Sequence, residues 1–328
     1  MPAVALDEIE ETTSRALVAH GAPEPVAASV ADAVRVAESN GNRICGHYYV
    51  ESHCRQLTTG RVRGDAAPTL IQDRAGAVRV DAHNGFAQWA FAAGFDAAVE
   101  AARANGTCGY SIEHSHTCTS LGYFTEQFAE VGLLALGATN STARVSAPGG
   151  TSRLLGTNPV AMAVPARTGG VAFQFDYSTS AVALGKITMA AAAGESIPLG
   201  WAVDADGNDT TDPNAALEGS LLSAGGYKGY GLGLMVELLA SALTGSRASI
   251  DIAPLKQPEG PHHDIGQFYL LIDPSSFSGS TFWDRVEALR EAIDQDPGAR
   301  LPGMRRDTPS AVDVDGGLWT QIQRLAES

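Results

Sequence analysis

The sequence predicts a mixed α/β protein with a helical N-terminal segment and without a Rossmann domain. Apolar residues recur at helical spacing over residues 5–20 and 24–40, which predicts two amphipathic helices at the start of the chain. From residue 108 onward, short apolar strands alternate with helices, as in α/β sheets. A Rossmann domain needs a GxGxxG turn directly after a strand, and the nearest glycine cluster, at 229–233, follows no strand.

The other elements follow in order along the chain. Residues 41–65 are irregular and rich in histidine, cysteine and tyrosine, and an alternating strand at 76–82 and an alanine-rich helix at 87–105 come next. Further strands are expected at 108–113, 133–139, 160–164, 171–175 and 268–272, and further helices at 122–131, 229–243, 281–294 and 318–326. The helix at 229–243 is strongly apolar, so we expect it to be buried, whereas the charges of 281–294 indicate a surface helix.

Composition and charge limit the possible partners. The 328 residues, 44% of them hydrophobic, predict a globular chain with two lobes. A net charge of -15 disfavours nucleic acid and anionic membrane surfaces as partners, and a small anionic substrate would need a local basic pocket. The chain shows no signal peptide, no apolar run of about 18 residues and no CxxC pair, so we expect a cytoplasmic protein.

Histidines and cysteines gather at 45–54 and at 114–118, which raises the question of a metal site. Zinc needs three or four converging nitrogen or sulfur ligands, and these spacings match no established zinc module. We therefore expect no metal, and we interpret these side chains as packing and hydrogen-bonding groups.

Six segments of the second half carry a recognisable pattern. They are LLGTNPVAMAVP (154–165), FDYSTSAVALGKI (175–187), GESIPLGWAVDADGNDTTDP (194–213), GGYKGYGLGLMVELLASALTG (225–245), HHDIGQFYLLIDPSSF (262–277) and LPGMRR (301–306). In this order they resemble the malate/L-lactate dehydrogenase-like family of NAD(P)-dependent oxidoreductases, which includes a reductase of cyclic imino acids. The resemblance implies a non-Rossmann mixed-sheet α/β fold, a homodimer with its active site near the subunit boundary, and NADP or NAD as cofactor.

The resemblance also implies how the chain is divided and where the cofactor lies. We expect a helical segment with an active-site loop (1–70), an NAD(P)-binding core (71–260) and a C-terminal segment that packs back on the N-terminal part (261–328). The residues expected to bind the cofactor are Ser115, Thr117, Thr157, Asn158, Asp176, Tyr177, Ser178, Thr179, Ser180, Lys186, Tyr227, Lys228, Gly303, Met304 and Arg305. Hydroxyl groups directly after a strand suit phosphate or ribose, and Lys228 opens a helix, where an anion is favoured. A solvated helix-cap charge remains the alternative for Lys228.

The chain departs from the family where the chemistry should occur. Cys45 stands at the position of the family's histidine acid and Tyr49 at that of its arginine. Thr117 replaces a second histidine, Leu184 an arginine and Met304 a glutamate. We take Cys45, His47, Tyr49 and Asp176 as the catalytic candidates; His53 and Tyr48 are further possible donors, by a shift of register.

These changes suggest a particular reaction. Hydride addition to a ketone creates an alkoxide and therefore requires a general acid, for which a thiol is poorly suited near neutral pH. An iminium ion already carries its proton and needs no such acid. The missing arginine suggests a substrate without a free carboxylate, or one that is bound elsewhere.

We therefore expect a reductase of a C=N bond, or of an unusual C=O bond, in secondary metabolism. Three alternatives stay open. The first is a 2-hydroxy acid dehydrogenase with a replaced proton donor. The second is a non-redox cyclase or isomerase that uses Cys45 as nucleophile or base, and the third is a pseudoenzyme that only binds the cofactor.

Overall fold

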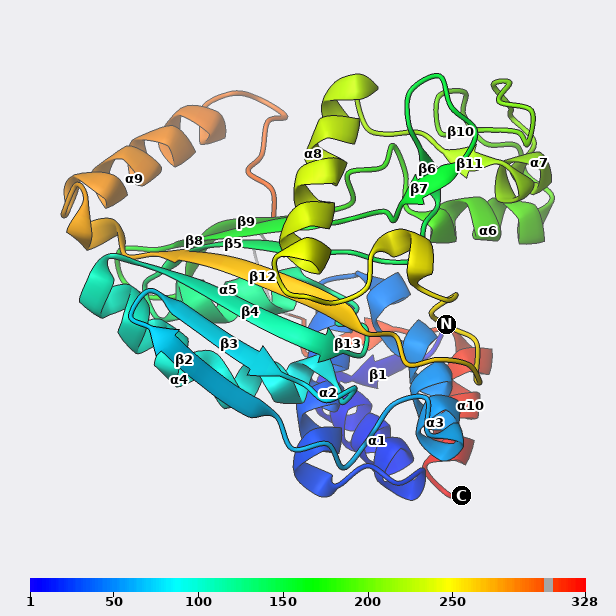
Figure 1. Cartoon of the computed structure of the whole chain (residues 1–328), viewed down its shortest axis with the longest axis horizontal. Coiled ribbons are helices and arrows are strands. Elements are labelled where there is room, and N and C mark those ends of the chain that lie inside the picture. The colour runs from blue at the N-terminus through cyan, green and yellow to red at the C-terminus, as the bar shows by residue number, and fades with distance from the viewer. Residues whose placement is uncertain (304–308) are drawn as a thin grey trace.

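The computed structural model describes residues 1–303 and 309–328, and a seven-stranded sheet lies at its centre (Figure 1). In spatial order, its strands are β2 (Thr69–Arg74), β3 (Ala77–Asp81), β4 (Thr107–Ser115), β12 (Ile265–Ile272), β5 (Leu134–Thr139), β8 (Val160–Pro165) and β9 (Val171–Tyr177). Neighbouring strands run antiparallel except β3 and β4, which run parallel because helix α4 (Ala87–Asn105) connects them. The mixed sheet agrees with the predicted fold class.

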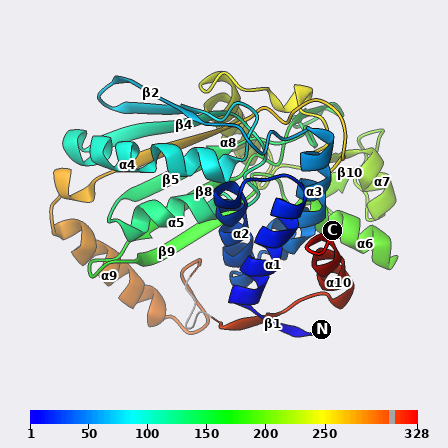
Figure 2. The same cartoon turned by 90° about the horizontal axis from the view of Figure 1, so that it is seen from below.

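Helices α4 and α5 (Gly122–Glu130) cover one face of this sheet (Figure 2). The rings of Phe91, Phe124, Phe128, Tyr110 and Tyr269 fill the space between the helices and the strands, and each is at most 1% exposed. The ring centroids of Phe91 and Phe124 are 4.9 Å apart. Large aromatic side chains bury more apolar surface per residue than other side chains. Their burial therefore contributes strongly to holding α4 and α5 against the sheet.

The N-terminal helices form a second hydrophobic cluster with the end of the chain. Their members are α1 (Leu6–Ala19), α2 (Glu24–Ser39), α3 (Val50–Thr59) and α10 (Gly316–Leu325). Strand β1 (Ala3–Ala5) pairs antiparallel with β13 (Ala311–Asp313), so the first and last segments of the chain lie side by side (Figure 2).

A small four-stranded sheet makes a third cluster. It contains β10 (Ala202–Val203), β11 (Ser220–Leu221), β6 (Val145–Ser146) and β7 (Arg153–Leu155), and α6 (Leu184–Ala193) and α7 (Pro213–Glu218) belong to the same part of the molecule. Ile187, Ile197 and Leu221 are buried at its centre. The chain enters this cluster from the ends of β5 and β9, so the cluster stands next to one end of the large sheet (Figure 1).

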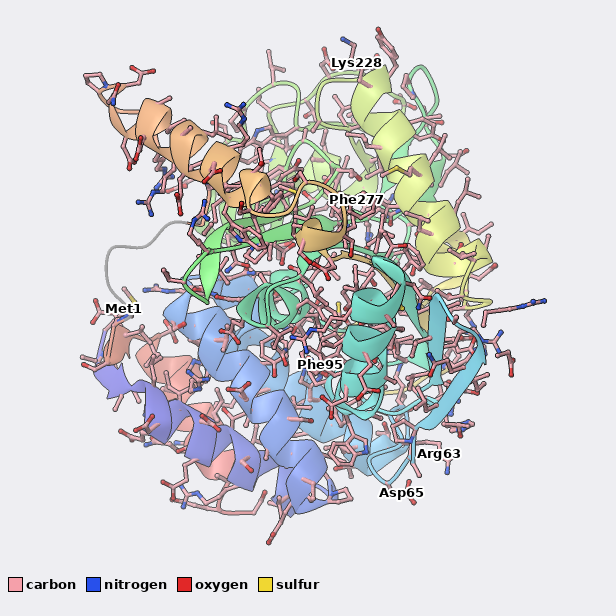
Figure 3. The ribbon with its side chains drawn as sticks, turned by 90° about the vertical axis from the view of Figure 1, so that its left-hand side faces the viewer. Met1, Arg63, Asp65, Phe95, Lys228 and Phe277 are labelled. Atoms are coloured by element: carbon pink, nitrogen blue, oxygen red, sulfur yellow. The ribbon has the colours of Figure 1, made fainter. Side chains whose placement is uncertain are left out.

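The expectation that the helix at 229–243 is buried was wrong. Helix α8 (Tyr227–Glu237) and the π-helical turn η3 (Leu238–Ala242) bury Gly229, Gly233 and Val236, but the apolar side chains on the opposite side face outward (Figure 3). The exposed fraction of Leu238 is 62% and that of Leu232 is 47%. A helix sequence that is apolar on all sides predicts that both faces are covered. It does not indicate whether the outward face is covered by the same chain or by another one.

The other predicted helices and strands are confirmed to within a few residues at their ends. Helix α9 (Thr281–Asp294) has no buried residue, as expected for a surface helix. The short turns are η1 (Arg43–Cys45), η2 (His47–Tyr49), η4 (Ser249–Asp251) and η5 (Pro274–Ser276). Helices α3, α6 and α7, β2 and the small strands were not predicted. Within the described residues, no helix has the length and apolar character that crossing a membrane would require.

Candidate active site

A cavity of about 780 Å³ opens where the three clusters approach one another. Turns η1 and η2, the ends of β4, β5 and β9, the start of α6 and the loop 254–256 supply its wall. The charged side chains in this wall are Arg144, Lys186, Lys256 and Asp176. Three cations and one carboxylate make a basic cavity in a chain of net charge -15, which is what a small anionic ligand needs.

The cavity gathers seven of the fifteen residues expected to bind the cofactor. Thr117, Thr157, Asp176, Tyr177, Ser178, Ser180 and Lys186 all line it. Arg144 lies in the same wall, and its buried Nε has no hydrogen-bond partner among the described residues. Burial and the neighbouring Arg153 lower the pKa of Arg144. A guanidinium of this kind is poised for an anion.

Three of the expected residues lie behind this wall and brace it. Asn158, with a positive φ of 37°, donates from Nδ2 to the Gly233 carbonyl (3.1 Å). The Thr179 hydroxyl donates to the Asn158 carbonyl (3.0 Å), and that of Ser115 to the Ile265 carbonyl (2.9 Å). Their side chains are therefore used in holding the backbone rather than in lining the cavity.

Three other expected residues do not reach the cavity. Tyr227 and Lys228 are exposed at the start of α8, and Figure 3 shows Lys228 at the outer end of that helix. Gly303 lies against the carbonyl of Gln174, where a Cβ would approach to 2.3 Å. Met304 and Arg305 lie outside the described residues.

The same cavity holds the residues that were predicted to replace the family's acid and arginine. Cys45 and Tyr49 both line it, together with Asp176 and Cys118, and we call this part of the wall the reaction end. Burial, reinforced by the charge of Asp176, raises the pKa of the Cys45 thiol to about 12. Burial likewise raises the pKa of the Tyr49 phenol. Both groups stay protonated at neutral pH and are weak acids there.

Asp176 is the carboxylate of this end. Its Oδ2 accepts hydrogen bonds from the Gly122 amide (2.8 Å) and the Ser120 hydroxyl (3.2 Å). Burial raises the pKa of Asp176, and these hydrogen bonds partly offset that effect. Gly122 permits the close approach, because a Cβ there would lie 3.0 Å from the Cβ of Asp176.

His47 does not reach the cavity, in contrast to our expectation for a substitute acid. Its amide and its Nδ1 lie 2.8 Å and 3.2 Å from Oε1 of Glu38, and its ring packs 5.3 Å from that of Trp319. Gly46 makes this possible, since a Cβ there would lie 2.2 Å from Oε1 of Glu38. The buried carboxylate thus turns His47 into the helical cluster.

His53 lies behind Tyr49 rather than in the cavity wall, with 5.7 Å between the two ring centroids. It adjoins His116 and His263, whose rings stack at 4.0 Å. Burial lowers the pKa of His53 and of His263 to about 3, and it also lowers that of His116. These imidazoles are neutral near pH 7 and cannot act as acids there. No group of three or more His, Cys, Asp or Glu side chains in the described residues is arranged to hold a metal ion.

Several cavity residues were not among the predicted site residues. Asn42, Cys118, Arg144 and Lys256 line the cavity but were not predicted as site residues. Lys256 lies in the irregular segment between η4 and β12, where no local pattern marks it. Arg144 could have been suspected only as a cation shortly after the expected strand 133–139.

The cavity residues suit a nicotinamide dinucleotide. Its phosphates require cations, which Arg144 and Lys186 can supply. The buried Nε of Arg144 has no hydrogen-bond partner within the described chain, and a phosphate oxygen of the cofactor would supply one. A volume of about 780 Å³ lies within the usual range of ligand pockets, roughly 300–1,000 Å³.

Comparison with known proteins supports this interpretation. Residues 4–319 match the malate/L-lactate dehydrogenase family. The chain belongs to that family. A Delta(1)-pyrroline-2-carboxylate/Delta(1)-piperideine-2-carboxylate reductase of Pseudomonas syringae pv. tomato is 37% identical over 328 residues, covering 99% of this chain and 95% of the relative. The (2R)-3-sulfolactate dehydrogenase (NADP(+)) of Chromohalobacter salexigens is 38% identical over 303 residues, covering 92% and 90%.

The fold of a solved relative agrees as well. The crystal structure of delta1-piperideine-2-carboxylate reductase from Pseudomonas syringae superposes on this chain with a TM-score of 0.91 at 35% identity, covering 99% of this chain and all of that one. A dehydrogenase from Sinorhizobium meliloti gives 0.88 at 29% identity, covering 99% and 98%. The predicted family of NAD(P)-dependent oxidoreductases and its non-Rossmann mixed-sheet fold are therefore confirmed.

Proposed function

We propose that this chain is an NAD(P)H-dependent reductase of a small cyclic imine, with an unusual carbonyl compound as the related second type of substrate. The names of its relatives support a reduction of this kind, because they include reductases of cyclic imino acids and a dehydrogenase of a 2-hydroxy acid. The observation that carries the proposal is the composition of the reaction end of the cavity. It combines a carboxylate with two high-pKa donors, and none of the described residues that line it is a histidine.

That composition favours a C=N bond over a C=O bond. The bound cofactor supplies a hydride. A carbonyl would then develop negative charge next to Asp176, and the Cys45 thiol and the Tyr49 phenol, whose pKa values are raised, are poor acids at neutral pH. A protonated imine is positive before the reaction and neutral after it. An ionised Asp176 favours the protonated, hydride-accepting form, because opposite charges in a partly buried site stabilise each other.

The alternatives are less well supported. A nucleophilic role for Cys45 requires its thiolate, whereas a pKa of about 12 keeps it as a thiol. A 2-hydroxy acid dehydrogenase would need a proton donor other than His47, since Glu38 holds His47 outside the cavity. A pseudoenzyme would bind the cofactor without turnover.

We further propose that the protein is a homodimer. Helix α8 and turn η3 expose Leu232, Leu234, Met235 and Leu238, and Leu154 of the adjacent strand β7 is 42% exposed. An apolar patch of this extent on one side of a helix is typical of a subunit interface.

The location and the division of the chain also remain proposals. Four free cysteines suit a reducing cytoplasm, and reduction of an unusual imine suits secondary metabolism. We propose that segments 1–70, 71–260 and 261–328 differ in function rather than forming separate folding units. In this division, the last segment supplies both the sheet strand β12 and the helix α10 of the N-terminal cluster.

The proposed reaction is tested by direct turnover. Cyclic imines and 2-oxo acids of the same carbon skeleton are supplied with NADPH and with NADH, and the absorbance of the reduced cofactor is followed. We expect the imines to be reduced faster. Fast turnover of pyruvate or oxaloacetate with imines untouched would reject the proposal, and cofactor binding without any turnover would favour the pseudoenzyme.

A further inference from the structure

A lysine stands at the reaction end of the cavity. Lys256 lines the cavity with Pro254 and Leu255, and its Nζ lies 3.2 Å from the ring centroid of Tyr48 and 5.8 Å from that of Tyr49. Tyr48 and Tyr49 line the same cavity. The ammonium is therefore held over an aromatic surface that faces the reaction end, where cation–π attraction stabilises its position.

The backbone around Lys256 is fixed from both sides. Gln56 of α3 donates from Nε2 to the carbonyl of Leu255 (2.7 Å) and to that of Gln257 (2.6 Å). Arg61 donates to the carbonyls of Pro254 (3.1 Å) and Gln257. Gln56 and Arg61 are buried, so the loop carries Lys256 in a set position rather than as a freely moving tip.

The Lys256 ammonium has no anionic partner in the described part of the chain. No carboxylate is paired with its Nζ there, and Glu51 of α3 is the acid whose charge acts on it, raising its pKa against the lowering effect of burial. Asp176, the one carboxylate that the described residues place in the cavity wall, already accepts two hydrogen bonds. A cation held in place beside a cavity without its own counter-charge is suited to a ligand anion.

The same end lacks the arginine that its family places at residue 49, where this chain has Tyr49. We propose that Lys256, stacked on Tyr48, binds the carboxylate of the substrate in place of that arginine. This inference rests on the proposed function and specifies its substrate as a cyclic imine that carries a carboxylate. The iminium nitrogen then lies towards Asp176 and the carboxylate towards Lys256.

A lysine differs from an arginine in how it selects such a group. The guanidinium binds a carboxylate through two parallel hydrogen bonds and fixes its plane, whereas an ammonium is a point charge that leaves the plane free. Lys256 therefore accepts substrates whose carboxylate is oriented differently relative to the ring. Binding should depend on the substrate's charge more than on the geometry of its carboxylate.

The experiment compares two ligands that differ in one charge. Picolinate and picolinamide are planar analogues of a six-membered cyclic imino acid and its amide, and their affinities are measured by calorimetry in the presence of NADPH. The variants are Lys256→Met and Lys256→Gln, with Lys256→Arg as the conservative change. Arg63→Met is the matched control, because it removes one positive charge at an exposed residue outside the cavity wall (Figure 3).

We expect the natural protein and the Arg63→Met and Lys256→Arg variants to bind picolinate about tenfold more tightly than picolinamide. Lys256→Met and Lys256→Gln should remove this preference and leave picolinamide binding unchanged. A preference that survives both substitutions, or none in the natural protein, overturns the inference. If imines are reduced but the preference for picolinate does not depend on Lys256, only this inference fails. If the preference for picolinate requires Lys256 but no imine is reduced, only the proposed function fails.

Discussion

Replacing Asp176 by asparagine separates its charge from its hydrogen bonds. The amide oxygen of asparagine can still accept from the Gly122 amide and the Ser120 hydroxyl, which lie 2.8 Å and 3.2 Å from Oδ2 in the natural protein. What Asp176→Asn removes is the negative charge. Two opposite charges about 5 Å apart attract each other by about 3 kcal/mol at an effective dielectric constant of about 20. We therefore expect kcat/KM for a cyclic imine to fall roughly 100-fold.

The pH dependence of both proteins sharpens this test. Burial raises the folded-state pKa of Asp176 above its unfolded value, so the natural enzyme should lose activity as the pH falls through that raised pKa. Asp176→Asn should lack this acidic limb. The same raised pKa means that the ionised carboxyl costs stability once the pH has risen through it. At pH 7 the variant should therefore be at least as stable as the natural protein, with the difference vanishing in acid.

The measurements are steady-state rates over a range of pH and thermal unfolding at pH 7 and pH 4. Ser178→Ala is a suitable comparison, since it changes an uncharged residue of the same wall and should leave the acidic limb in place. Full kcat/KM in Asp176→Asn, or a stability loss of several kcal/mol at pH 7, would show that the charge of Asp176 does not have the role assigned to it.

Three further predictions concern the cysteine, the active-site turn and the buried histidines. A pKa of about 12 instead of 9.0 lowers the thiolate fraction of Cys45 about 1,000-fold. Iodoacetamide at pH 7 should therefore label Cys45 far more slowly than a free thiol, which mass spectrometry can follow. Rapid labelling would contradict this. Gly46→Ala should lower the free energy of unfolding by about 2 kcal/mol because its Cβ meets Glu38, whereas Gly231→Ala, with open space around it, should not; equal urea midpoints would be inconsistent with the contact. His53 and His263 have pKa values of about 3 in the folded protein, so on acidification the unfolded chain becomes protonated at these residues before the folded one does. The free energy of unfolding should therefore decline as the pH drops below about 6.5. Unfolding free energies that stay constant from about pH 7 to about pH 4.5 would count against neutral buried imidazoles.

Local patterns predicted the elements that carry a strong periodicity. The helices at 87–105 and 281–294 were placed at the observed bounds, because their apolar or charged spacing is continuous. Helix α6, whose first turn contains Gly185 and Lys186, was not predicted. The burial of α8 was misjudged because an outward apolar face and an inward one have the same spacing.

Site residues could be predicted from the sequence only where neighbours in the sequence decide their position. Ser178 and Ser180 follow directly after β9, and they and Lys186, which were predicted from the family resemblance, line the cavity. The direction of His47 depends on Glu38, nine residues earlier, and no spacing rule indicates that pairing. Lys256 reaches the cavity through Gln56, about two hundred residues away in sequence. Contacts over such distances are set by the tertiary fold.

The account rests on a hydride acceptor that already carries its proton, and a solvent isotope effect tests this directly. Single turnovers of a cyclic imine carboxylate with NADPH are recorded in H₂O and D₂O at a pH where the imine is protonated. We expect the rate of cofactor oxidation to be nearly the same in both solvents, because no proton from Cys45 or Tyr49 moves with the hydride. A rate at least about twofold slower in D₂O would show a protein acid at work in the transition state.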